Sequence, residues 1–136
     1  MKNRLLFSFV VVISFGSCKK DSVIDVPSNL TGQWSWIRSC GGIAGICYTP
    51  ISTKARIRIV FATDSIYQFY RNDTLKVSDR FHVYKLNSAD DRAIKYDNSS
   101  NGQTYFIRKD TLFLNDFCCD GYSQIYKRMN GRLFIH

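Results

Sequence analysis

The 136-residue chain contains no glutamate, so all 11 of its acidic residues are aspartates. It also has only two prolines, two histidines and two methionines. Glutamate is among the stronger helix formers, and its absence argues against a mainly helical fold. Two histidines leave little material for a catalytic or metal-binding histidine cluster. What the chain does have is ten phenylalanines and eight tyrosines, which fit pleated sheets. The composition therefore indicates an all-β fold.

The N-terminus has the pattern of a bacterial lipoprotein signal. Lys2 and Arg4 supply a positive start, and residues 5–15 form an apolar run. That run is shorter than the roughly 20 residues that span a bilayer as a helix, so a transmembrane helix is not expected. Gly16-Ser17 supply the small residues that a signal peptidase requires, and Cys18 follows as the expected lipidation site. An ordinary signal peptide that contains a cysteine near its end is the alternative.

This pattern predicts three parts of the chain. Residues 1–17 are expected to be a signal peptide, residues 18–29 a lipidated N-terminus and flexible linker, and residues 30–136 one β-barrel domain. Acyl chains on Cys18 would tether the protein to a membrane. We therefore expect a cell-envelope protein, an outer-membrane lipoprotein facing the periplasm or the cell surface, in a compartment where disulfides persist.

From residue 30 onward, short runs of alternating apolar and polar residues are separated by turn residues, which is typical of strands. No stretch of ten or more residues has helical apolar spacing. An Asn-Gly pair at 130–131 could turn the chain into a short ninth segment at 132–135. The eight main predicted strands are 32–40, 54–62, 65–71, 74–86, 92–97, 103–108, 110–117 and 122–129.

Eight short antiparallel strands with tight connections must bury one face and hide two sheet edges. Closing the sheet into an eight-stranded, antiparallel, up-and-down β-barrel does both. A two-sheet sandwich is the competitor, but it usually needs longer crossing connections. In the barrel, the connections 41–53, 72–73, 98–102 and 118–121 lie at one end, which predicts an elaborated mouth there and a tight base at the other end.

The same barrel predicts where the cysteines meet, because its last strand pairs with its first. Cys40 ends the first strand and Cys118-Cys119 precede the last, so both lie at one rim. We expect two bridges, each linking Cys40 or Cys47 to Cys118 or Cys119, with the pairing left open. A bridge between the adjacent Cys118 and Cys119 is an alternative. Zinc is disfavoured because adjacent cysteines chelate one ion poorly, so neither a metal nor a cofactor is expected.

Gly32-Gln33-Trp34 resembles the Gly-x-Trp signature of the lipocalins, and Arg128 matches in order the arginine that covers the tryptophan at the closed base. Four further segments resemble the lipocalin-like domain lipoproteins of the Bacteroidota type. The resemblance covers about residues 29–129 and implies a lipocalin-like barrel, while most members have no assigned ligand. Cys47, Cys118 and the tail after Met129 depart from it. The four segments are 39–45, 48–50, 110–114 and 120–123.

No catalytic constellation is found in the sequence, so no catalytic residue is assigned and an enzyme is not expected. Residues 121–125 fail the Gly-x-Ser-x-Gly elbow at the last position, and Asp90-Asp91 is better explained as a turn. The formal net charge of +8 comes from lysines and arginines scattered along the strands. A basic but unclustered surface does not favour a nucleic acid partner.

The strand aromatics leave two interpretations, a filled barrel or a narrow apolar pocket rimmed by tyrosine hydroxyls. The leading hypothesis is a non-enzymatic, lipid-anchored, lipocalin-like protein of the cell envelope that binds a small hydrophobic or amphipathic ligand at its mouth. The alternative is an envelope interaction module with a solid barrel whose loops contact a protein or glycan. The residues expected to shape the mouth are Ile43, Ile46, Tyr48 and Tyr122. The strand aromatics are Tyr67, Phe69, Tyr70, Phe81, Tyr84, Tyr96, Tyr105, Phe106 and Phe113.

Overall fold

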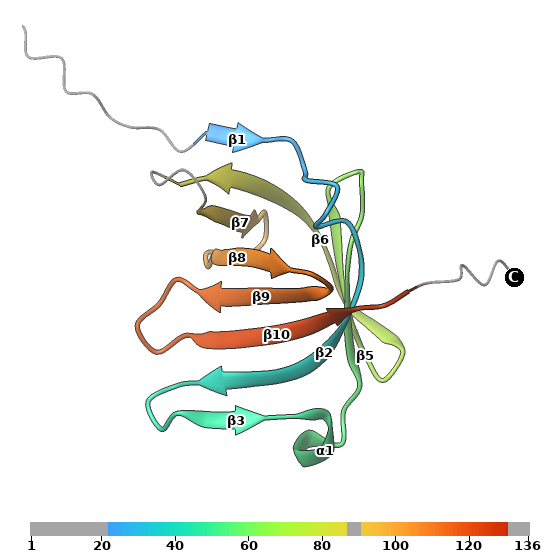
Figure 1. Cartoon of the computed structure of the whole chain (residues 1–136), viewed down its shortest axis with the longest axis vertical. Helices are drawn as coiled ribbons and strands as arrows, with labels where there is room; N and C mark the ends of the chain where they lie inside the picture. The colour runs from blue at the N-terminus through green and yellow to red at the C-terminus, as the bar shows by residue number, and fades with distance from the viewer. Residues whose placement is uncertain (1–21, 87–90, 131–136) are drawn as a thin grey trace, which may run out of the picture.

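A computed structural model describes residues 22–86 and 91–130 of the chain (Figure 1). This part is nearly all β. The signal peptide, Cys18 and the short segment expected at 132–135 lie outside the described residues. The elements, in chain order, are β1 (Ser22–Ile24), β2 (Gly32–Gly41), β3 (Ile46–Tyr48), α1 (Pro50–Thr53), β4 (Ile57–Phe61), β5 (Ile66–Arg71), β6 (Thr74–Lys85), β7 (Arg92–Tyr96), β8 (Gln103–Arg108), β9 (Thr111–Asp116) and β10 (Tyr122–Arg128).

The predicted eight-stranded antiparallel up-and-down barrel is confirmed. Strands β4 to β10 each pair antiparallel with the next, β2 pairs with β4, and β10 returns to pair with β2. Each of the eight predicted strands corresponds to one of these barrel strands within three residues at either end. The Asn72-Asp73 turn has positive φ at both residues, 49° and 62°, as a tight hairpin turn requires.

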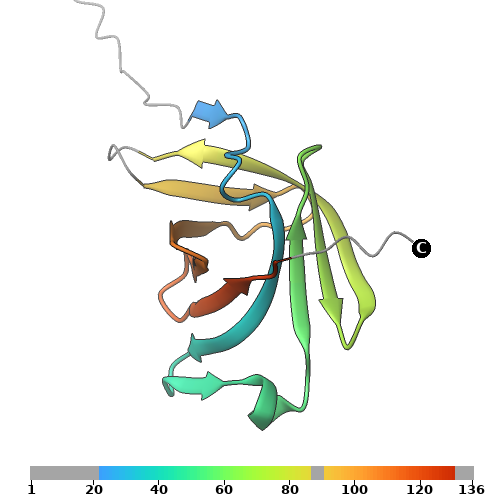
Figure 2. The same cartoon turned by 45° about the vertical axis from the view of Figure 1, so that its right-hand side comes forward.

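The barrel is sharply folded at β6. The first part of β6, from Thr74 to Arg80, pairs with β5, whereas Phe81 to Lys85 pair with β7. In Figure 1 the strands β2, β10, β9 and β8 lie side by side, and the β5–β6 hairpin stands across one end of them. Figure 2 shows the same hairpin running at a steep angle to the curved strand β2. The first half of β6 therefore pairs with β5 but not with β7, and one side of the barrel is open there.

The connection at 41–53 is not the long loop that was expected. Strand β3 folds back onto β2, and the short helix α1 follows it. Thr49 caps this helix by accepting a hydrogen bond from the Ser52 backbone N–H, and Pro50 occupies its first turn. Lys54 then ends the helix with a left-handed φ of 49°. The strand expected at 54–62 consequently begins only at Ile57.

The segment expected to be a linker, residues 18–29, is described from residue 22 onward, where it lies against the barrel. Strand β1 pairs with the end of β6, with Ile24 opposite Val83. Ile24 and Val26 then pack against the hydrophobic core. The apolar side chains of Ile24 and Val26 are enough to hold residues 22–29 on the barrel. The composition of this segment did not indicate that contact.

The base of the barrel is closed by the residues of the predicted signature. Trp34 is fully buried, and its indole N–H donates to the Leu30 carbonyl over 2.9 Å. The guanidinium carbon of Arg128 lies 4.1 Å from the centre of the indole ring. Arg128 also donates to the carbonyl oxygens of Thr31 and Asn29. Gly32 has a φ of 127°, and a Cβ there would lie 3.0 Å from the arginine, so glycine suits both the backbone and the contact.

The core fills the base half of the barrel. Its buried members come from every barrel strand except β5, together with the segment before β2. Partly buried Tyr67, Phe69 and Tyr96 pack against it. No helix in the described part of the chain has the length and apolar character needed to cross a membrane. The buried cluster consists of Leu30, Trp34, Trp36, Ile59, Phe61, Phe81, Val83, Ile94, Tyr105, Leu112, Leu114 and Tyr126.

Candidate functional site

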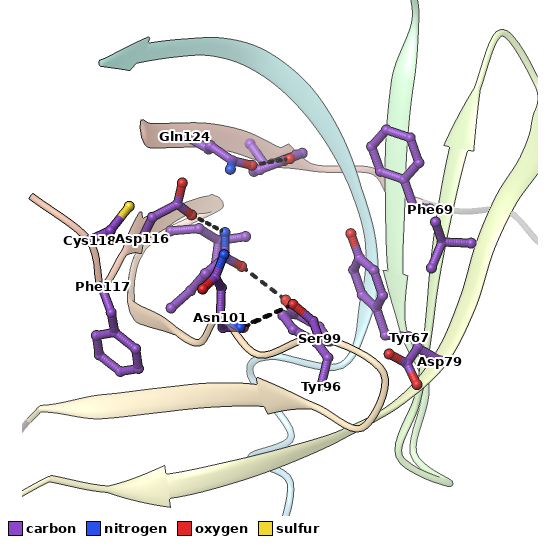
Figure 3. Close-up of a pocket in the computed structure, with 14 residues that line it drawn as sticks. Tyr67, Phe69, Asp79, Tyr96, Ser99, Asn101, Asp116, Phe117, Cys118 and Gln124 are labelled. Atoms are coloured by element: carbon purple, nitrogen blue, oxygen red, sulfur yellow. Dashed lines mark hydrogen bonds between the residues drawn. The ribbon is translucent and has the colours of Figure 1, made fainter. Parts of the chain in front are cut away.

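A cavity of about 360 Å³ lies above this core, toward the mouth (Figure 3). Residues of the 98–102 and 118–121 connections contribute to its wall, so two of the four connections predicted at the mouth border it. Figure 3 places Asp116 and Gln124 on one side and Asp79, Tyr67 and Phe69 on the other. The lining residues are Tyr67, Phe69, Val77, Asp79, Tyr96, Ser99, Asn101, Gln103, Leu114, Asp116, Phe117, Cys118, Gln124 and Tyr126.

The cavity exists because the inward-facing positions change character along the strands. Alternate residues of a strand share one face of the sheet. On β9, inward Leu112 and Leu114 are buried in the core, and the next inward residue is Asp116 at the cavity. On β10, the inward neighbour of Tyr126 toward the mouth is Gln124. Apolar side chains thus fill the base half, while polar ones surround a hollow in the other half.

One wall of the cavity is a continuous hydrogen-bonded chain. The Tyr96 hydroxyl donates to Gln103 Oε1 over 3.0 Å, and Gln103 Nε2 donates to Asp116 Oδ1 over 2.8 Å. The other carboxylate oxygen of Asp116 accepts from the Tyr122 backbone N–H over 3.0 Å. Side chains from β7, β8 and β9 are therefore fixed relative to one another, which pre-organises this wall.

The opposite wall is organised by Asp79 on β6, which is only 8% exposed. Its Oδ1 accepts from the Asn98 side-chain amide over 2.7 Å and from the Arg80 backbone N–H over 2.8 Å. Its Oδ2 accepts from the Asn98 backbone N–H over 3.1 Å. Asp79 thereby ties the connection after β7 to the first half of β6, at the place where the barrel lacks strand pairing.

Three tyrosines complete the cavity wall with neutral phenols. Desolvation by burial raises the pKa of Tyr67, Tyr96 and Tyr126 above the usual value. For Tyr96, the negative fields of Asp116 and Asp79 add to this rise in pKa. The rings of Tyr67 and Tyr96 lie 4.8 Å apart between centroids, and the Tyr126 hydroxyl donates to Gln124 over 2.7 Å.

The four residues predicted to shape the mouth do not line this cavity. Ile43 is 92% exposed at the tip of the β2–β3 hairpin. Ile46 and Tyr122 pair with Gly41 from its two sides, as Tyr48 and Gln124 pair with Ser39. Paired residues share a face of the sheet, so Tyr48 lies in the same row as the cavity residue Gln124, and Ile46 and Tyr122 lie on the same face in the next row outward. They form an apolar rim beside the cavity, with the Tyr48 and Tyr122 rings 6.3 Å apart.

The predicted disulfides between the first connection and the Cys118-Cys119 pair are wrong. Cys40 and Cys47 are bridged to each other, with their Cα atoms 4.0 Å apart. The physical reason is the unexpected β3 strand, which places Cys47 directly opposite Cys40 in the ladder. Cys118 and Cys119 are free and both exposed, although Cys118 contributes to the cavity wall.

The described cavity wall supplies hydrogen-bonding side chains and aromatic rings. His82 and Asp97 are in contact over 2.9 Å, but Phe81 and Val83 on either side of His82 are buried, so the histidine faces outward. Over residues 22–86 and 91–130, no group of three or more His, Cys, Asp or Glu side chains could hold a metal ion. The arrangement can therefore enclose a small molecule and hydrogen-bond to it.

Reasoning from the sequence offered nine strand aromatics as either barrel filling or the rim of a pocket, and of these nine only Tyr67, Phe69 and Tyr96 line the cavity. It missed Asp79, Gln103, Asp116 and Gln124. A usable signal was present, because each of these four polar residues falls on the core-facing alternation of its strand, Asp79 in the middle of β6 and the other three near the mouth ends of their strands. A polar residue in a core-facing position is more informative than an exposed one.

A scan against models of protein families finds no match, and a search of the curated proteins finds none either. The fold and the cavity define this chain as an eight-stranded lipocalin-like β-barrel with an open, partly polar interior. The resemblance to the lipoproteins of the Bacteroidota type rests on its sequence motifs.

Proposed function

We propose that the chain is a non-enzymatic, lipid-anchored, lipocalin-like protein of the cell envelope that binds a small amphipathic ligand inside its barrel. The cavity of about 360 Å³ carries this proposal. Its volume falls within the range of roughly 300–1,000 Å³ that is usual for small-molecule sites. A barrel that served only as a scaffold would gain stability by filling this space with side chains, because empty interior volume costs packing energy.

The lining favours an amphipathic ligand over a purely apolar one. Phe69, Phe117 and Leu114 supply apolar contact, whereas Asp116, Gln103 and Tyr96 form the hydrogen-bonded wall. Most small-molecule sites combine apolar walls with a few fixed polar groups that orient the ligand.

The envelope location is supported by two features. The motif ending at Cys18 has the pattern of a lipoprotein signal. The Cys40–Cys47 bridge fits an oxidising compartment such as the periplasm or the cell surface. Together they favour an outer-membrane lipoprotein that contacts its membrane through lipid.

The test is mass spectrometry of the small molecules released from natively purified protein. We expect one compound recovered near one equivalent. Val77→Trp should abolish its recovery, because Val77 lines the cavity from β6. The matched control is Leu75→Trp, on the same strand and equally exposed at 45% but outside the cavity wall. Equal recovery from both variants, or no compound from the unaltered protein, would reject the carrier function.

A second candidate function is favoured by a separate observation. Ile43 and Ile51 are 92% and 90% exposed, on the β2–β3 hairpin and on helix α1. Large apolar side chains this exposed are common at contact sites with other molecules. An interaction module whose loops contact an envelope protein or glycan would leave the released fraction empty. Photocrosslinking from position 43 in cells would then give one discrete product, which Val77→Trp leaves unchanged.

A further inference from the structure

We propose that the ligand of this cavity is an organic cation, a small amphipathic amine in protonated form, whose charge lies between Asp79 and Asp116. The inference names the ligand class for the site described above and rests on the proposed function. Its basis is the charge of the cavity wall, which is opposite in sign to the charge of the whole protein.

The cavity wall contains two carboxylates, and none of the described residues that line it is a lysine, arginine or histidine. This is unusual for the chain, which carries 19 lysines and arginines against 11 aspartates. Because the chain has such an excess of cationic side chains, a cavity wall lined by two carboxylates and by no described cationic residue is unexpected. The sign of the cavity therefore favours a positively charged occupant.

The described partners of both carboxylates are hydrogen-bond donors. Asp79 accepts hydrogen bonds from the Asn98 amide and from backbone N–H groups, and Asp116 accepts from the Gln103 amide and a backbone N–H. These donors are all neutral. In the part of the chain that the structure describes, no cation pairs with either carboxylate.

The hydrogen bonds fix the position of both carboxylates but leave acceptor sites on each of them unused. An ionised carboxylate has about four acceptor sites, of which Asp116 uses two and Asp79 three. Each therefore retains a lone pair for an ammonium donor. A charge-assisted hydrogen bond from such a donor is roughly twice as strong as a neutral one.

Two tyrosine rings also line the cavity. The Tyr96 hydroxyl is linked to Asp116 through the Gln103 side chain. The ring centre of Tyr67 is 4.8 Å from that of Tyr96, with the planes inclined at 55°. Tyrosine faces attract ammonium groups through their quadrupoles, and this attraction grows when the cation is desolvated.

An organic cation fits better than a metal ion. The two carboxylates lie on opposite sides of the hollow in Figure 3, and among the described residues no group of three or more His, Cys, Asp or Glu side chains could hold a metal ion. Phe69 and Phe117 provide apolar contact that a hydrated metal ion would not use but an alkyl or aryl chain would.

The experiment is calorimetric titration of the delipidated, ligand-free protein with three probes of equal chain length: octylamine, octanol and octanoate. We expect octylamine to bind at least ten-fold tighter than octanol, and octanoate to bind most weakly. The preference for octylamine should shrink as salt is raised, because ions screen the attraction. This comparison needs no variant.

Two substitutions then locate the charge. Asp116→Asn and Asp79→Asn should each lower octylamine affinity about ten-fold while leaving octanol affinity unchanged, which also reports that the barrel is intact. Asp73→Asn is the matched control, because Asp73 is an exposed aspartate whose ion pair with Arg56 lies outside the cavity wall. It should change neither affinity.

The outcomes separate this inference from the proposed function. Equal affinities for the three probes, or preference for octanoate, would reject a cationic ligand and leave a carrier in place. Binding of octylamine that Val77→Trp does not weaken would place it outside the cavity and reject the inference as well. If no probe binds and the native extract is empty, the carrier function itself fails.

Discussion

The carbonyl oxygen of Gly121 lies directly against the α-carbon of Gly41, so closely that a Cβ on residue 41 would overlap it. The same Cβ would lie 2.8 Å from the α-carbon of Tyr122. Gly41 ends β2 with a φ of 156°, and Gly121 precedes β10. Through this contact, two connections at the mouth pack directly against each other through their backbones. One of them carries the disulfide and the other carries the free cysteines.

Replacing Gly41 by alanine should therefore destabilise the mouth. We expect Gly41→Ala to cost about 3 kcal/mol of unfolding free energy, from backbone strain and overlap together. Gly45→Ala is the control, because its φ of 61° is also positive but nothing lies within 4 Å of its added Cβ. It should cost only about 1 kcal/mol. Urea unfolding measures both, and equal costs would show that the contact with Gly121 contributes nothing.

Arg128 stacks on Trp34 at the base of the barrel, so we predict that a side chain with the same charge but no planar group cannot substitute for it. Arg128→Lys keeps the positive charge but loses the planar group over Trp34 and one of two carbonyl contacts. We expect a loss of about 1–2 kcal/mol in urea unfolding, against about 3–5 kcal/mol for Trp34→Ala. The neighbouring exposed Lys127 is the control, and Lys127→Ala should be nearly neutral. An Arg128→Lys protein as stable as the parent would rule out a role for the stacked geometry.

The revised disulfide predicts a definite thiol count. In a soluble form beginning at Lys19, two of four cysteines should react with a thiol reagent under native conditions, namely Cys118 and Cys119. Peptide mapping should recover Cys40 linked to Cys47, and their joint replacement by serine should cost about 2 kcal/mol because the closed loop is short. A disulfide-linked peptide that joins Cys40 or Cys47 to Cys118 or Cys119 would contradict the Cys40–Cys47 bridge and support the pairing expected from the sequence.

The buried phenols predict loss of stability at alkaline pH. The pKa of Tyr67, Tyr96 and Tyr126 is raised in the folded protein, so the unfolded chain releases these protons first as pH rises. Their contribution is complete below about pH 10, the ordinary tyrosine value, and is lost progressively above it. Urea unfolding from pH 7 to 12 should reveal the decline. Tyr96→Phe should make it shallower, and an unchanged slope would contradict the assignment.

The sequence was sufficient for the barrel strands because alternation and turn chemistry agree along most of the chain. Asn72-Asp73 is one such place, where two residues that tolerate positive φ join two alternating runs. The Gly32, Trp34 and Arg128 contacts were also predictable, because these residues match the signature that the lipocalin resemblance implies. Local pattern and global closure point the same way in these segments.

The elements that sequence reasoning missed are short or depend on tertiary contacts. Strand β3 has three residues, all exposed, and no alternation to detect. Its presence reversed the disulfide prediction, because Cys47 returns to Cys40 before the chain reaches the other rim. The acidic wall was missed for another reason. Asp79 and Asp116 resemble ordinary polar strand residues until the barrel's inward face is known.

Strand β1 occupies the edge of β6 that β5 leaves uncovered. Val83 to Lys85 carry β7 on one side and β1 on the other, so their backbone groups are paired in both directions. A protein shortened to begin at Leu30 would expose that row of N–H and C=O groups and uncover the apolar surface under Ile24 and Val26. Open edges of this kind invite strand addition from a second chain. Residues 22–24 therefore cover this edge of β6 and leave it unavailable for pairing with a strand of another molecule.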